Sequence, residues 1–176
     1  RISYRVARAL QHSGITPGDK VAVLSSNHAL GFACVFGISR AAAVWCPVNP
    51  RNEASENRFV LDAFDCNCLI FHSNYAPMVE QMRANLPKVR VYVCLDAALD
   101  FAPSWAQWVE GVSDAPIDIT PVDDLAMIAG TGGTTGQPKG VMLSGHNLET
   151  MSALTLMGYP FDGRPTYLAL APLTHA

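Results

Sequence analysis

Apolar runs and helical repeats alternate along the first 112 residues. Between Ile2 and Leu10, apolar residues recur at helical spacing, which predicts a helix that ends before Gly14. The valine-rich run at 21–25 predicts a buried strand. The segment at 28–43, rich in small apolar residues, predicts a buried helix.

The same alternation continues as far as residue 112. The predicted strands are 44–48, 68–72 and 89–95. Three helices are predicted between and after them: the first has Asn57, Val60, Leu61 and Phe64 on one face, the second runs from Tyr75 to Leu86, and the third is short, at 104–112. Strands that alternate with helices imply right-handed crossovers. The predicted fold class is therefore α/β, with a mainly parallel sheet and helices on both faces.

The last third of the chain begins after a polar stretch. Residues 113–124 hold two prolines and four aspartates, which indicates a linker. An apolar strand at 125–130 then leads into a glycine-rich loop and directly into a helix at 144–157, capped by Ser144. A further strand is predicted at 166–171.

These elements predict the organisation of the chain. Residues 1–112 form a first α/β portion, residues 113–124 the linker, and residues 125–176 a strand, loop, helix and strand. Both portions belong to one incomplete larger domain. The start at Arg1 and the end at Ala176, just past a predicted strand, indicate a piece of a longer polypeptide.

Composition and charge argue against some classes of protein. The net charge is −3 and the basic residues are scattered, so the chain lacks the electrostatic footprint of a nucleic-acid binder. The longest uncharged run, at 21–39, contains several polar residues, which argues against a transmembrane segment. Only 15% of the residues are charged, so we expect part of the surface to be covered by another protein part, and the isolated chain to self-associate as a homo-oligomer.

The five cysteines are odd in number and mostly lie inside apolar runs, where a thiol acts as a small hydrophobe. This usage is typical of a reduced, cytoplasmic setting. Cys66 and Cys68 form a C-x-C pair without a second pair or a nearby histidine pair, so we predict no metal site there.

The loop GTGGTTGQPKG at 130–140 carries the candidate chemistry. Successive glycine amides form concave nests that suit phosphate oxygens, and the threonines add hydroxyl donors. Lys139 adds a compact positive charge, and Pro138 keeps Gln137 extended. The loop follows a strand, where open α/β sheets bind ligands. A flexible linker and a solvated surface lysine are the alternatives.

Two well-known phosphate loops do not match this sequence. The P-loop requires a lysine followed by serine or threonine, but Lys139 precedes Gly140. The G-x-G-x-x-G dinucleotide fingerprint, counted from Gly130, meets Thr135 at its last position.

The segment from Thr131 to Gly140 resembles the phosphate loop of the adenylate-forming superfamily, which includes acyl-CoA synthetases, luciferases and nonribosomal-peptide adenylation domains. The usual form of that loop is T-S-G-T-T-G-x-P-K-G, and here Gly132 replaces the serine and removes one hydroxyl, which puts the affinity or the order of the loop in doubt. The resemblance implies that the loop holds the β- and γ-phosphates of ATP through Thr131, Gly132, Gly133, Thr134, Thr135, Gly136 and Lys139.

Two less specific segments resemble the same superfamily. AAAVWCPVNP at 41–50 is similar to the helix end, strand and N-P turn of its members. LAPLTHA at 170–176 is similar to the segment whose final histidine or aromatic residue lines the acyl and adenylate pocket, which makes His175 a candidate pocket residue. The alternative for His175 is an exposed histidine near the end of the chain.

The resemblance implies a reaction in two halves. A carboxylic acid attacks ATP to give an acyl-adenylate and pyrophosphate, and a thiol, usually coenzyme A, then takes the acyl group. Mg²⁺ is expected to neutralise the phosphates, but Asp123 and Asp124 lie at the far end of the predicted strand, about 20 Å from the loop. The remaining catalytic segments are expected in a missing C-terminal part, so we expect the chain alone not to turn over.

Within this resemblance the chain is part of the large N-terminal domain of an acyl-CoA-synthetase-like enzyme, and the apolar residues around His175 favour a fatty or related hydrophobic acid. An enzyme with a different acyl acceptor, as in luciferases or peptide synthetases, is one alternative. A nucleotide-binding or phosphate-binding module without ligase activity is another, and a structural or partner-binding domain is a third.

Overall fold

The computed structural model describes residues 1–117, 119–121, 124–131 and 138–159, together with residues 161, 163, 164, 166, 168 and 171. The predicted strand at 166–171 lies mostly outside the described residues.

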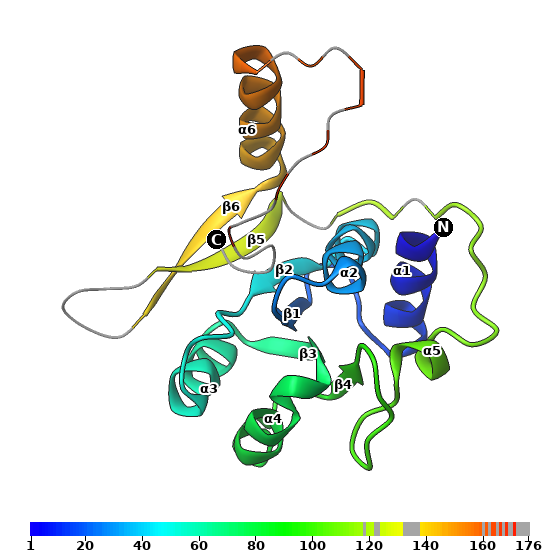
Figure 1. Cartoon of the computed structure of the whole chain (residues 1–176), viewed down its shortest axis with the longest axis vertical. Helices are drawn as coiled ribbons and strands as arrows, with labels where there is room; N and C mark the ends of the chain where they lie inside the picture. Colours follow the sequence, from blue (N-terminus) through cyan, green and yellow to red (C-terminus); the bar gives the residue numbers. More distant parts are fainter. Residues whose placement is uncertain are drawn as a thin grey trace.

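A sheet in the order β4-β3-β1-β2-β5-β6 forms the centre of the fold (Figure 1). Its strands are β1 (Lys20–Leu24), β2 (Val44–Pro47), β3 (Cys66–Phe71), β4 (Val91–Cys94), β5 (Leu125–Thr131) and β6 (Lys139–Ser144). Each neighbouring pair from β4 to β5 is parallel, and β6 is antiparallel to β5. The predicted, mainly parallel α/β sheet is confirmed.

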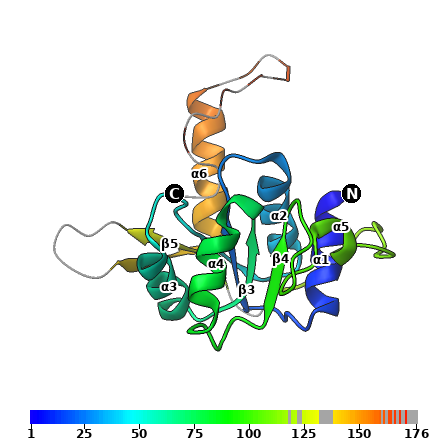
Figure 2. The ribbon, with the colours of Figure 1, turned by 60° about the horizontal axis from the view of Figure 1, so that its bottom comes forward.

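Helices cover both faces of this sheet (Figure 2). They are α1 (Ile2–His12), α2 (Ala29–Arg40), α3 (Ala54–Ala63), α4 (Ala76–Arg83), α5 (Trp105–Trp108) and α6 (Gly145–Gly158), with a 3₁₀ turn at Ser73–Tyr75 before α4. Side chains alternate along β1, so Val21 and Val23 join one core with α1 and α2, and Ala22 and Leu24 join another with α3 and α4.

The cysteines are divided between these two cores. Cys34 and Cys68 lie on the α1–α2 side and Cys46 and Cys66 on the α3–α4 side, and all five thiols of the chain are free and buried. Burial raises the pKa of Cys34 to about 12. The predicted role of the cysteines as small core residues is confirmed. Within the described ranges, no group of three histidine, cysteine or acidic residues could hold a metal ion.

Two predicted elements differ from the structure. The helix expected at 104–112 is the shorter α5, which ends at Trp108. The expectation that the loop leads directly into a helix was wrong, because residues Lys139–Ser144 form β6 before α6 begins. This strand is short and largely exposed, so its apolar residues give no run long enough to separate it from the loop. Ser144 caps α6 as predicted, accepting a 3.0 Å hydrogen bond from Asn147 N.

Among the described helices, none is both long enough and apolar enough to cross a membrane.

The crossing of α1 and α2 depends on a close backbone approach. A Cβ atom placed on Gly37 would lie 2.3 Å from Val6 Cγ1 and 3.1 Å from the backbone oxygen of Ser3. Val6 is fully buried, so it has no room to move away. Gly37 therefore lets the two helices pack at this distance.

Gly37→Ala should reduce the free energy of unfolding by about 1–3 kcal/mol, because the added methyl group overpacks the α1–α2 contact. Urea denaturation of the chain measures this change. Gly158→Ala is the matched control, since a Cβ atom at Gly158 meets nothing within 4 Å. Equal unfolding midpoints for the two variants would contradict this account of the crossing.

Candidate functional site

The glycine-rich loop connects β5 to β6, the two strands of an antiparallel hairpin. Gly130 pairs with Gly140, and Thr131 pairs with Lys139 as the last pair before the loop. Thr131 Oγ1 also donates a 3.2 Å hydrogen bond to the backbone oxygen of Lys139. The structure therefore brings Thr131 and Lys139 together at the base of the loop. The other predicted loop residues, Gly132, Gly133, Thr134, Thr135 and Gly136, lie outside the described residues.

The loop begins at the carboxyl edge of the parallel sheet, because β5 runs parallel to β2. The ladder between these two strands is short, with Trp45 paired to Met127, so the end of β5 extends beyond it (Figure 1). This edge is where open α/β sheets bind ligands. The predicted position of the loop relative to the sheet agrees with this arrangement.

Lys139 is exposed at this edge. Among the residues that the structure describes, no carboxylate forms an ion pair with its ammonium group. An exposed ammonium group on the residue paired with Thr131 suits an anionic ligand, since no described carboxylate neutralises its charge.

Acidic groups lie at the opposite end of β5. The backbone oxygen of Asp124 accepts a 2.7 Å hydrogen bond from Gly145 N, which joins the start of β5 to the start of α6. The seven residues of β5 place Asp124 about 20 Å from the loop. Asp124 is therefore too far from the loop to ligate a metal ion there, and Asp123 lies outside the described residues.

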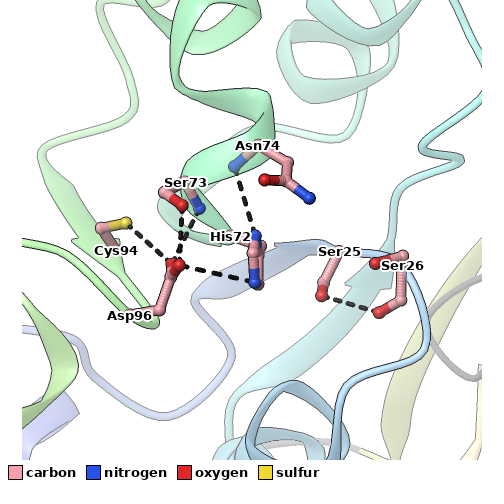
Figure 3. A network of polar contacts seen from close by, with 7 residues as sticks. All are labelled: Ser25, Ser26, His72, Ser73, Asn74, Cys94 and Asp96. Carbon is pink, nitrogen blue, oxygen red and sulfur yellow. Dashed lines mark hydrogen bonds and ion pairs between the residues drawn. The ribbon is translucent and has the colours of Figure 1, made fainter.

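A second polar cluster lies at the same carboxyl edge, after β3 and β4 (Figure 3). The Asp96 carboxylate accepts hydrogen bonds from Ser73 Oγ at 2.6 Å and Ser73 N at 2.9 Å. Cys94 Sγ donates to it at 3.5 Å, and His72 Nε2 lies 3.5 Å away. The ring of His72 also meets that of His28 edge to face. The cluster joins the ends of the two strands.

The environment of Asp96 shifts its titration. Burial by itself would raise the pKa of Asp96, but the hydrogen bonds from Ser73 and Cys94 and the charge of His72 together outweigh this effect, and the pKa is lowered overall. Sequence reasoning missed the cluster because His72 has no histidine, cysteine or acidic partner at a spacing that suggests a site. The remaining signal was its place at the end of the strand predicted at 68–72.

The segment that holds His175 begins near the end of β1. Asn27 Nδ2 donates a 3.0 Å hydrogen bond to the backbone oxygen of Ala171. Asn27 follows β1, so residue 171 lies at the carboxyl edge. His175 itself lies outside the described residues, and its place in a pocket stays a prediction.

Comparison with known proteins assigns the family. A family model described as AMP-binding enzyme matches residues 2–176. The fatty acid–[acyl-carrier-protein] ligase ScoC of Streptomyces coeruleorubidus is 34% identical over 147 residues, which are 82% of this chain and 27% of that protein. A feruloyl-CoA synthase of an Amycolatopsis species is 32% identical over 173 residues, which are 98% of this chain and 32% of that protein.

The fold is also found among solved structures. A Rhodopseudomonas palustris CGA009 protein named as a long-chain-fatty-acid CoA ligase superposes with a TM-score of 0.88 over 99% of this chain and 44% of that one, at 23% identity. The chain belongs to the AMP-binding enzyme family, the adenylate-forming ligases that its loop resembles. It spans about a third of the length of the curated relatives it matches.

Asp96→Asn should remove stability that depends on pH. Because the pKa of Asp96 is lowered in the folded state, its contribution is present above the unfolded pKa of about 3.9 and is lost as the pH falls through the folded pKa. The difference in unfolding free energy between wild type and variant should therefore shrink below about pH 4. Urea denaturation across this range measures it.

Ser73→Ala is the companion variant, because it removes only the hydroxyl donor at 2.6 Å. The difference in unfolding free energy between wild type and Ser73→Ala should also shrink below about pH 4, but by a smaller amount than for Asp96→Asn. If the free energies of unfolding of wild type and Asp96→Asn differ by the same amount at every pH, the Asp96 carboxylate does not have this role.

Proposed function

We propose that the chain is the part of an adenylate-forming enzyme that holds the pyrophosphate end of ATP while a carboxylic acid is activated. The observation that carries the proposal is the β5–β6 hairpin, which pairs Thr131 with the exposed Lys139 at the base of a family-type phosphate loop. Its position at the carboxyl edge of the sheet supports the same role.

Each described residue has a limited task in this proposal. The Lys139 ammonium neutralises charge on the departing pyrophosphate, and the Thr131 hydroxyl, now bonded to the Lys139 backbone, is within reach of the same ligand. Lys139 offers one positive charge, so Mg²⁺ would have to supply the rest. Asp124, the described carboxylate at the start of β5, is too far from the loop, so the metal ligands would come from elsewhere in the enzyme.

The acyl acceptor is proposed to be a thiol. The similarity to a feruloyl-CoA synthase supports coenzyme A. A second candidate, the thiol of an acyl-carrier protein, is favoured by the 34% identity to ScoC, which is named as an acyl-carrier-protein ligase. The same relative supports the proposal of a fatty or related hydrophobic acid as substrate. Supplying the enzyme with coenzyme A or with a pantetheinylated carrier distinguishes the two acceptors.

The surface of α6 supports a covering partner. Every residue from Glu149 to Tyr159 is exposed, and the apolar residues are spread around the helix rather than along one stripe. Figure 1 shows α6 extending away from the other helices. A helix that is apolar all round is normally buried. We propose that the rest of a longer polypeptide covers α6, and that copies of the chain cover it when that part is missing.

Lys139→Ala in the full-length enzyme should lower carboxylate-dependent ATP–pyrophosphate exchange about a hundredfold, because the positive charge at the base of the loop is lost. Lys20→Ala is the matched control, since Lys20 is the first residue of β1 and lies at the opposite edge of the sheet. The proposal fails if Lys139→Ala exchanges at the wild-type rate.

The 176-residue chain alone should self-associate, because α6 exposes large apolar side chains: Met151, Leu154, Leu156 and Met157 are between 57% and 79% exposed. Light scattering at high concentration measures the mass. Leu154→Glu with Met157→Glu should shift the chain toward monomer, whereas Ile2→Glu, at a 45% exposed position on α1, should not. If the wild-type chain stays monomeric at high concentration, the proposal that copies of the chain cover α6 is wrong.

A further inference from the structure

Phe64 forms the C-cap of α3 and lies against the hairpin that carries the loop. Its side chain is 7% exposed and belongs to the same core cluster as Ile128 of β5. The residue lies far from the loop in sequence, and the proposed function gives it no task.

The ring of Phe64 occupies the space that side chains on Gly130 and Gly140 would enter, near the base of the loop. A Cβ atom placed on Gly140 would lie 2.8 Å from Phe64 Cε1 and 3.1 Å from Cζ, and one placed on Gly130 would lie 3.9 Å from Cζ. Gly130 and Gly140 are paired with each other directly before Thr131 and Lys139. The ring therefore packs over the glycine pair next to the proposed phosphate contacts.

This contact lies where the sheet supports the hairpin least. The pairing of β5 with β2 is at Met127, four residues before Thr131. The outer strand, β6, is exposed from Lys139 to Met142. In the described part of the chain, Phe64 packs between the hairpin end and the core on the α3 side of the sheet.

Phe64 is itself held firmly. The Nδ2 atom of the fully buried Asn57 donates a 3.1 Å hydrogen bond to the backbone oxygen of Asn49, which fixes α3 to the preceding turn. On the other side of Phe64, Asp65 adopts a positive φ of 55° and pairs with Lys88. The ring is therefore attached to a fixed support.

We propose that Phe64 is a positioning residue for the nucleotide site: it sets the direction in which the β5–β6 hairpin presents Thr131 and Lys139. This inference rests on the proposed function for its ligand, ATP. A displacement of about 1 Å at a reacting site can cost about a hundredfold in rate, so a side chain that orients the hairpin affects catalysis without touching the substrate.

The test compares Phe64→Leu, which shortens the contact, with Phe64→Met, which keeps its reach. Amide hydrogen exchange of the chain measures whether residues 129–131 and 139–141 open more easily. In the full-length enzyme, ATP–pyrophosphate exchange gives the KM for ATP and the KM for the acid. Met82→Ala, in the core under α4 and 2% exposed, is the control for a general loss of stability.

Phe64→Leu should accelerate exchange at the hairpin amides and raise the KM for ATP about tenfold, with the KM for the acid unchanged. In Phe64→Met, the exchange rate of the hairpin amides and the KM for ATP should both lie closer to the wild-type values. Met82→Ala should not affect the hairpin amides more than the rest of the chain, and it should not change the KM for ATP more than the KM for the acid. The proposal is overturned if Phe64→Leu and Met82→Ala affect the hairpin amides and the KM for ATP equally.

The two proposals fail in different ways. If the wild-type full-length enzyme shows no ATP–pyrophosphate exchange with any acid, the proposed function is wrong. Hydrogen exchange then decides alone: faster exchange confined to the hairpin in Phe64→Leu supports the positioning role, and unchanged exchange overturns it.

Discussion

The fold depends on burying β1 from both faces. Residues Val21 to Leu24 are fully buried, with alternate side chains entering one core under α1 and α2 and another under α3 and α4. Parallel strands need helical crossovers, and these crossovers supply the two covering layers. The same requirement puts the carboxyl ends of β1 to β5 at one edge. Both the Asp96 cluster and the start of the glycine-rich loop lie at that edge because of the topology.

Much of this arrangement is readable from the sequence, because buried parallel strands are short apolar runs and their crossover helices are long. The prediction was wrong at residues 139–144, where β6 forms although its side chains are mostly exposed. No burial pattern marks such an edge strand. It is defined by backbone pairing with β5, which cannot be seen in one sequence. The Asp96 cluster was missed for a related reason, since Ser73 and Asp96 lie 23 residues apart and meet only through the β3–β4 pairing.

The glycines at 130–140 do not all serve the same purpose. The sequence indicates a loop whose amides bind phosphate, and this proposed role applies to residues between Thr131 and Lys139. Gly140 has a packing role, because a Cβ atom placed on it would lie 2.7 Å from Ile128 Cγ2 and 2.8 Å from Phe64 Cε1. The spacing of a motif therefore reflects both ligand contacts and the shape of the support beneath it. A sequence match gives the two kinds of position equal weight, and only the structure separates them.

The packing beneath the hairpin matters because a glycine-rich loop loses much conformational entropy when it becomes ordered. Each glycine loses more conformational freedom on folding than other residues, so a loop of several glycines binds weakly unless its two ends are already fixed. The Gly130–Gly140 pair and the hydrogen bond from Thr131 to Lys139 fix the two ends relative to each other. They do not fix the hairpin relative to the sheet, since the ladder with β2 lies further back at Met127. In the proposed arrangement, side-chain packing by Phe64 at the end of α3 supplies this contact, so an apolar core residue contributes to the binding of an anion.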